Sequence, residues 1–191
     1  MDDKNVPKCP EGSDATSLIR TYIQAKDENR PHLMARAFAP DATLRMAVKS
    51  DAISFPARTE GLQAISDVLV RRFGQAYDNV YTFCVAGTGP EDAAESYRCD
   101  WLVGMTTKAD GSVRVGCGSY VWQFGRHAAG RLVRELEITI EAMEVLPPEL
   151  AETVVDGWLS RLPYPWCKAS EVHAHAPTLP QLTPVLQYLQ P

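Results

Sequence analysis

The chain has 191 residues, and 19 Lys and Arg against 24 Asp and Glu give it a formal net charge of −5. This mildly acidic balance argues against nucleic-acid binding through phosphate neutralisation, and the length fits one domain. No apolar stretch approaches the roughly 18 residues needed to cross a bilayer. The five cysteines are scattered and form no Cys-x-x-Cys pair. We therefore expect a cytoplasmic protein with no membrane partner, metal site or structural disulfide.

The first third of the chain has mainly helical spacing. Residues 1–12 are polar and rich in turn-forming residues, and we expect them to be disordered or extended. Apolar residues recur at helical intervals over 13–26, 31–38 and 61–73, which predicts three helices. A strand is predicted over 43–48, between the second and third helices.

From Tyr77 onward the apolar period changes to two residues. Strands are predicted over 80–86, 95–106, 112–124 and 131–145, with turn residues between them. A run of helices followed by hairpin-linked strands is typical of an α+β domain. We expect a curved antiparallel sheet wrapped around the N-terminal helices to form a cone with an internal pocket.

The domain is expected to span residues 13–145, and the remaining residues, 146–191, form a C-terminal extension. Apolar residues every four positions from Leu150 predict a helix, and six later prolines predict an extended arm. Tyr164 and Trp166 lie in that arm. Because exposed aromatic rings are unfavourable, we expect them to pack on the domain or on a partner subunit.

The motif Phe38-Ala-Pro-Asp-Ala-Thr-Leu44 and the glycine-led helix from Gly61 precede the long strands. This order resembles the cone-shaped α+β domain of the nuclear-transport-factor-2-like superfamily, over residues 13–145. The resemblance implies a pocket open at one end. The superfamily includes ketosteroid isomerase, SnoaL-like polyketide cyclases, scytalone dehydratase, limonene epoxide hydrolase and binding proteins without catalytic activity.

The resemblance to ketosteroid isomerase implies a role for Tyr22, which matches the tyrosine that donates a hydrogen bond to the enolate. The position of the general base falls on Met46, and that of the second oxyanion donor falls on Tyr120. A thioether cannot abstract a proton, so the isomerase activity is disfavoured. The two tyrosines can still polarise a carbonyl group.

The resemblance to limonene epoxide hydrolase implies an arginine and an aspartate one residue apart on a strand, with a second carboxylate on the last strand. Arg98-Cys99-Asp100 has this spacing, and Glu137 falls at the position of the second carboxylate. Period two places Arg98 and Asp100 on one face of their strand.

Two interpretations of the sheet faces remain open. In the first, Arg98, Asp100 and Glu137 share the pocket face with the aromatic run Tyr120, Trp122 and Phe124, and nearby glycines open space. The apolar opposite face is then buried in a homodimer formed through the sheet. In the second, the apolar side chains face the helices and the charged ones face water, because burying unpaired charges is costly.

We expect a small-molecule-binding domain for a largely apolar organic ligand, with no cofactor. Acid–base catalysis would use Asp100 or Glu137 as the base, with Arg98 orienting it and Tyr22 and Tyr120 polarising an oxygen. Ligand contacts are expected from Trp122, Phe124, Met46 and Phe55. The alternative is a non-catalytic dimerisation or ligand-carrier module whose pocket is filled by its own side chains or by the C-terminal arm. A third candidate is the small subunit of a ring-hydroxylating dioxygenase.

Overall fold

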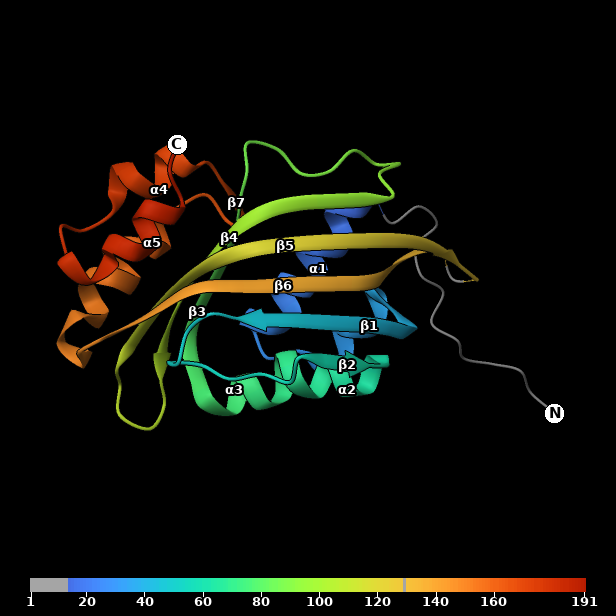
Figure 1. The fold of residues 1–191 in the computed structure, drawn as a ribbon, viewed down its shortest axis with the longest axis horizontal. Coiled ribbons are helices and arrows are strands. Elements are labelled where there is room, and N and C mark those ends of the chain that lie inside the picture. The colour runs from blue at the N-terminus through green and yellow to red at the C-terminus, as the bar shows by residue number, and fades with distance from the viewer. Residues whose placement is uncertain (1–13, 129) are drawn as a thin grey trace.

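The computed structural model describes residues 14–128 and 130–191, so the predicted N-terminal stretch 1–12 lies outside the described residues. One curved sheet of seven strands, in the order β2-β1-β6-β5-β4-β3-β7, runs through the molecule. Helices α1, α2 and α3 lie on its concave side, and the C-terminal helices α4 and α5 lie against its other side at one end (Figure 1). The α+β cone predicted from the sequence is confirmed.

The strands are β1 (Phe38–Val48), β2 (Arg58–Glu60), β3 (Tyr77–Val85), β4 (Ser96–Thr107), β5 (Val113–His127), β6 (Gly130–Leu146) and β7 (Trp166–Cys167). The helices are α1 (Ala15–Asp27), α2 (Leu62–Ser66), α3 (Arg72–Ala76), α4 (Ala169–His175) and α5 (Thr183–Tyr188). Shorter helical turns are η1 (Pro31–Arg36), η2 (Asp67–Arg71), η3 (Pro148–Leu150), η4 (Glu152–Asp156), η5 (Leu159–Arg161) and η6 (Pro180–Leu182). Within the described ranges, no helix combines the length and apolar character needed to cross a membrane.

Helix α1 begins where the sequence predicts, because Asp14 caps it. The carboxylate of Asp14 accepts a hydrogen bond of 2.6 Å from the backbone N–H of Ser17. The apolar stripe of α1 is buried against the concave face, with Ile19, Tyr22 and Ile23 all inaccessible to solvent. This stripe anchors the inner core of the cone.

The long strands form two consecutive hairpins, β4 with β5 and β5 with β6. Strand β1 starts at Phe38, five residues before the predicted start, and runs parallel to β6. Register shifts interrupt the pairing of β1 with β6 and of β5 with β6. The extra residues bend the sheet, which allows it to wrap around α1.

The C-terminal extension covers the convex face and forms a second core there. Its apolar side chains pack on strand residues that point away from α1: Phe83, Leu102, Val113, Val115 and Cys117. Trp158 is fully buried in this core, and its Nε1 donates a hydrogen bond of 3.1 Å to the carbonyl oxygen of Val172.

The expectation of an extended arm was wrong for α4, η6 and α5. Pro180 and Pro184 occupy the first turns of η6 and α5, where a missing N–H costs nothing. The expectation that the aromatic segment packs on the domain is confirmed, since β7, which begins at Trp166, pairs with β3. The extension thereby covers apolar sheet surface on which the dimer prediction depended.

Candidate functional site

A narrow cavity of about 40 Å³ lies between α1 and the concave face of the sheet. Its lining consists of Tyr22, Lys26, Met46, Ile53, Phe55, Leu69, Phe73, Trp101, Val103, Met105, Tyr120, Ile138, Ile140 and Met143. Three of these residues, Ile53, Phe55 and Phe73, also line an outer pocket of about 290 Å³ beside α3. The shared wall places the wider pocket directly next to the narrow one.

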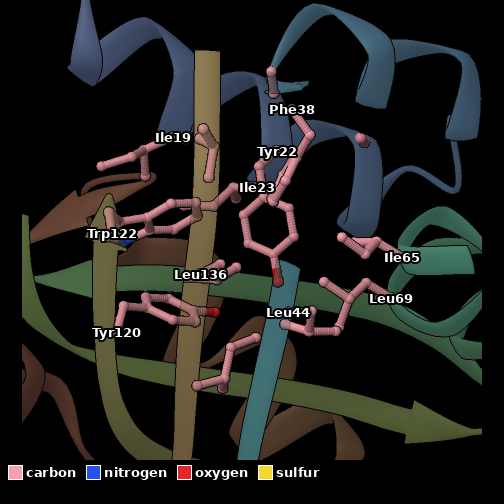
Figure 2. Close-up of a cluster of buried hydrophobic side chains, with 14 of the residues drawn as sticks. Ile19, Tyr22, Ile23, Phe38, Leu44, Ile65, Leu69, Tyr120, Trp122 and Leu136 are labelled. Carbon is pink, nitrogen blue, oxygen red and sulfur yellow. The ribbon is translucent and has the colours of Figure 1, made fainter. Parts of the chain in front are cut away.

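Tyr22 sits at the centre of an aromatic cluster (Figure 2). Its ring centroid lies 5.4 Å from that of Trp122, 5.8 Å from that of Phe38 and 6.3 Å from that of Tyr120. The side chain is fully buried, and its hydroxyl makes no hydrogen bond of ordinary distance and angle with any residue in the described ranges, although the nearby hydroxyl of Tyr120 lowers its pKa slightly. Burial raises the pKa of Tyr22 above its ordinary value of 10, so the hydroxyl is a hydrogen-bond donor at neutral pH.

Trp101 supplies a second polar atom without a partner. Its ring centroid lies 5.7 Å from that of Tyr120, and its buried Nε1 has no acceptor among the described residues. A Cβ atom on Gly118 would lie only 2.9 Å from Cζ2 of Trp101. The glycine thus makes room for the indole ring in the cavity wall, whereas the first interpretation of the sheet placed Trp101 on the outer face.

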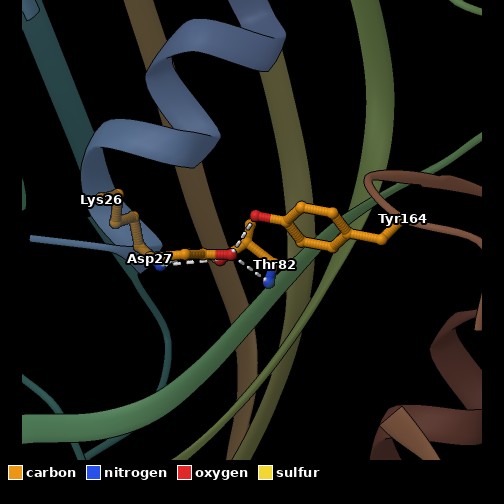
Figure 3. Close-up of polar contacts among 4 residues, drawn as sticks. All are labelled: Lys26, Asp27, Thr82 and Tyr164. Carbon is orange, nitrogen blue, oxygen red and sulfur yellow. Dashed lines mark hydrogen bonds and ion pairs between the residues drawn. The ribbon is translucent and has the colours of Figure 1, made fainter. Parts of the chain in front are cut away.

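Lys26 lies one helical turn after Tyr22 and belongs to a buried polar network (Figure 3). Its Nζ donates a hydrogen bond of 2.8 Å to Oγ1 of Thr82 on β3, and lies 3.4 Å from Oδ1 of Asp27. Thr82 donates its hydroxyl to Oδ1 of Asp27 at 2.6 Å and its backbone N–H to Oδ2 at 2.8 Å. Tyr164 donates to the same Oδ2 at 2.9 Å, which ties the C-terminal extension to α1.

Loss of hydration lowers the pKa of Lys26, and the neighbouring charge of Asp27 opposes this change. The Nζ atom also lies 4.2 Å from the centroid of the Phe73 ring, at the shared wall of the two pockets. Lys26 therefore places an amine in a cavity whose other lining side chains are aliphatic, thioether or aromatic.

The structure places four of the predicted site residues in the cavity wall: Tyr22, Tyr120, Met46 and Phe55. Trp122 and Phe124 are buried in the same inner core, next to the cavity but outside its lining. The pair of tyrosines expected from the sequence is thus present.

The expectation that Arg98, Asp100 and Glu137 share a face with Tyr120 was wrong. Tyr120 is paired with Cys99 on one side and with Ile138 on the other, so these neighbours share its face. The three charged residues point to the convex side. There Arg98 and Glu137 are exposed, and Oδ1 of Asp100 accepts a hydrogen bond of 3.1 Å from the hydroxyl of Tyr188 in α5.

Hairpin register explains the error. The turn between β4 and β5 pairs odd residues of β4 with even residues of β5, as in Cys99 with Tyr120 and Trp101 with Gly118. The first interpretation grouped even residues of β4 and odd residues of β6 with the even residues of β5, whereas Tyr120 is paired with Cys99 and Ile138. A change of one residue in register moves every side chain to the opposite face. Because Arg98 and Glu137 then face water, burial of unpaired charge is avoided, as the second interpretation required.

The sequence analysis missed Lys26, Asp27 and Trp101 as site residues. A signal for Lys26 was present, because it continues the stripe of Tyr22 at i+4, where a charged residue faces the core. Trp101 required the register described above, and the contact of Asp27 with Thr82 joins segments 55 residues apart.

No model of a known protein family and no curated protein matches this sequence. Solved structures match it at low identity. A nuclear transport factor 2-like superfamily protein from Salmonella enterica serovar Typhimurium is 14% identical to this chain, with a TM-score of 0.55. The match covers 66% of this chain and 88% of the Salmonella protein. The hexachlorocyclohexane dehydrochlorinase LinA-type3 from Novosphingobium barchaimii is 11% identical with a TM-score of 0.53, covering 68% and 85%.

The Kfla4162 protein from Kribbella flavida is 15% identical with a TM-score of 0.54, and the match covers 66% of this chain and 88% of that protein. At these identities the likeness concerns the backbone and leaves the site open. The chain has the fold of the nuclear-transport-factor-2-like superfamily.

Proposed function

We propose that the protein binds a small, largely apolar organic molecule that carries a carbonyl oxygen, and that this oxygen accepts a hydrogen bond from Tyr22. The observation that carries the proposal is the hydroxyl of Tyr22, which is buried in the cavity wall with no partner in the described residues. Leaving a buried donor unpaired costs about 1–3 kcal/mol, and a ligand acceptor removes that cost.

The two pockets match the two parts of such a ligand. The inner cavity, of about 40 Å³, suits a carbonyl group with its adjacent carbon atoms. The outer pocket, of about 290 Å³, suits an apolar body lying against Phe55 and Phe73. Apolar walls with a few convergent polar atoms are typical of ligand sites.

The structural neighbours are compatible with this proposal. One of them is named for dehydrochlorination of hexachlorocyclohexane, a small apolar molecule. Acid–base chemistry on a ligand in this cavity would use Tyr22, Tyr120 and Lys26, because Arg98, Asp100 and Glu137 lie on the other face.

The non-catalytic module with a pocket filled by the C-terminal arm is less well supported. Every residue that lines the cavity lies between Tyr22 and Met143, and most apolar side chains of the C-terminal extension pack on the convex face. Of the four buried side-chain donors that lack a partner among the described residues, two belong to the cavity wall, namely the Tyr22 hydroxyl and Trp101 Nε1.

A comparison of two probes tests the proposal. Acetophenone has a carbonyl oxygen, and ethylbenzene has a similar shape without it. We expect calorimetric titration to show that Tyr22→Phe weakens acetophenone binding about 5-fold to 10-fold, the equivalent of one hydrogen bond of about 1–1.5 kcal/mol. Ethylbenzene binding should be unchanged.

Phe55→Ala is the matched second variant, since it widens the wall shared by the two pockets and leaves Tyr22 in place. It should weaken both probes equally, because it removes apolar contact without removing a hydrogen-bond donor. Equal affinity of wild type and Tyr22→Phe for acetophenone would refute the proposal.

A further inference from the structure

Lys26 is a buried lysine in the wall of the proposed ligand site. Its side chain is 9% exposed, and its neighbours in the cavity wall carry no charge. Tyr22 and Lys26 are four residues apart on α1, so both side chains project from the same face of the helix. One face of α1 thus contributes both an amine and a hydroxyl to the cavity wall.

We propose that Lys26 forms an imine with an aldehyde or ketone bound in the cavity, while Tyr22 holds the carbonyl oxygen. The inference rests on the proposed function, because the carbonyl group that Tyr22 binds is the group that Lys26 attacks. In net terms, the lysine ammonium and the carbonyl compound condense to a protonated imine and one water molecule.

The buried network provides a path for the proton that Lys26 must lose before its nitrogen can attack. Nζ donates to Oγ1 of Thr82 at 2.8 Å, and this hydroxyl donates to Oδ1 of Asp27 at 2.6 Å. The proton can therefore pass through Thr82 to the carboxylate of Asp27.

The subsequent steps balance without any oxidant or reductant. The nitrogen lone pair adds to the carbonyl carbon, the carbonyl π electrons move to the oxygen, and the Tyr22 hydroxyl stabilises the resulting oxyanion. A proton then moves from nitrogen to this oxygen. The proton held by Asp27 returns to the new hydroxyl group, which leaves as water, and the carbon–nitrogen double bond forms.

The surroundings of Lys26 favour the free amine and the product. Desolvation lowers the pKa of Lys26, and a desolvated lysine is a recognised imine-forming nucleophile. The carboxylate of Asp27 lies 3.4 Å from Nζ and can balance the charge of the protonated imine. The ring of Phe73, 4.2 Å from Nζ, covers the amine on the side of the outer pocket.

Reductive trapping tests the inference on the intact chain. Wild-type protein is incubated with benzaldehyde and sodium cyanoborohydride at neutral pH, and peptide mapping by mass spectrometry locates the benzylated lysines. Lys49 and Lys108 serve as internal controls, because their side chains are 58% and 41% exposed. A lowered pKa leaves a larger fraction of free amine at neutral pH, so we expect benzylation at Lys26 to be faster than at Lys49 although Lys26 is buried.

Two variants separate the chemistry from simple accessibility. Lys26→Arg keeps the positive charge but forms no imine, and it should abolish the cavity adduct while Lys49 reacts as before. Tyr22→Phe keeps the amine and removes the donor, and it should slow the trapping at Lys26. Acetophenone added in excess should replace part of the benzyl adduct at Lys26 with a 1-phenylethyl adduct, because this ketone forms the same kind of imine.

The outcomes distinguish this inference from the proposed function. If the exposed lysines are benzylated and Lys26 is not, the imine site is overturned. If acetophenone still binds through Tyr22 in that case, the proposed function stands. If acetophenone fails to bind and Lys26 is unmodified, both fail. Rapid benzylation at Lys26 without acetophenone binding supports the amine site and refutes the role of Tyr22.

Discussion

The hydroxyl of Tyr22 is a polar group within the apolar inner core. It is buried among aromatic rings, and no described residue accepts its hydrogen. A buried donor without a partner costs about 1–3 kcal/mol relative to an apolar replacement of the same shape. A group retained at such a cost is typical of a binding site, where stability and function compete.

We predict that Tyr22→Phe raises the free energy of unfolding by about 1 kcal/mol or more, since the ring contacts remain and the unpaired hydroxyl is removed. Urea denaturation of both proteins at neutral pH measures the difference. A less stable Tyr22→Phe variant would show that the hydroxyl is satisfied in the folded protein and would remove the main argument for a ligand.

The same variant has a defined pH dependence. The pKa of Tyr22 is raised by burial, so the folded state keeps its proton above pH 10, where an unfolded tyrosine loses it. The wild type therefore loses stability as pH rises above 10, and Tyr22→Phe loses less. In urea denaturation above pH 10, the difference in free energy of unfolding between Tyr22→Phe and the wild type should increase with pH. A difference that does not change with pH would contradict the burial of this phenol.

Individual strands and helices could be predicted from the sequence much better than their relative placement. The stripe of α1, the glycine-led helix and the long strands follow from local periodicity. The face to which Arg98 and Asp100 point depends on how the turn pairs β4 with β5, which periodicity within one strand does not specify. The Lys26–Asp27–Thr82 network depends on contacts between distant segments and could not be predicted in the same way.

Strand β5 is shaped by Gly118, which lies beside Trp101 and at a shift in the pairing with β6. A Cβ atom there would lie 1.8 Å from the backbone carbonyl oxygen of Thr139, and that oxygen cannot move without distorting β6. We predict that Gly118→Ala destabilises the protein by about 3 kcal/mol, the upper range for overpacking.

Thermal unfolding followed by circular dichroism measures this effect. Gly87→Ala is the control, because a Cβ atom at that position would contact nothing within 4 Å, and it should change stability by less than about 0.5 kcal/mol. If the two variants unfold at the same midpoint temperature, β5 and β6 do not approach each other closely at Gly118.

At the scale of the whole molecule, two cores share one sheet. The inner core contains the cavity, and the outer core forms between the convex face and the C-terminal extension. The hydrogen bonds from Tyr164 to Asp27 and from Tyr188 to Asp100 fasten the extension to the cone. The first of these contacts joins the extension to the network that holds Lys26.

We predict that deletion of residues 147–191 causes the cone to self-associate. The deletion exposes side chains such as Leu102, Val115 and Cys117, and apolar patches of this kind drive association. Size-exclusion chromatography with light scattering measures the mass of the particle in solution. Divided by the mass of one chain, this value should be larger for the truncated protein than for the intact one. An unchanged association state would mean that the extension does not protect the convex face.

The central claim is that the hydroxyl of Tyr22 is a hydrogen-bond donor reserved for a ligand carbonyl. Infrared difference spectroscopy of acetophenone, labelled with ¹³C at the carbonyl carbon and bound to the Lys26→Arg protein, which forms no imine, tests it most directly, because a hydrogen bond to the oxygen lowers the stretching frequency. We predict a lower frequency in this protein than in the same protein with the additional substitution Tyr22→Phe. The same frequency in both proteins would contradict the claim.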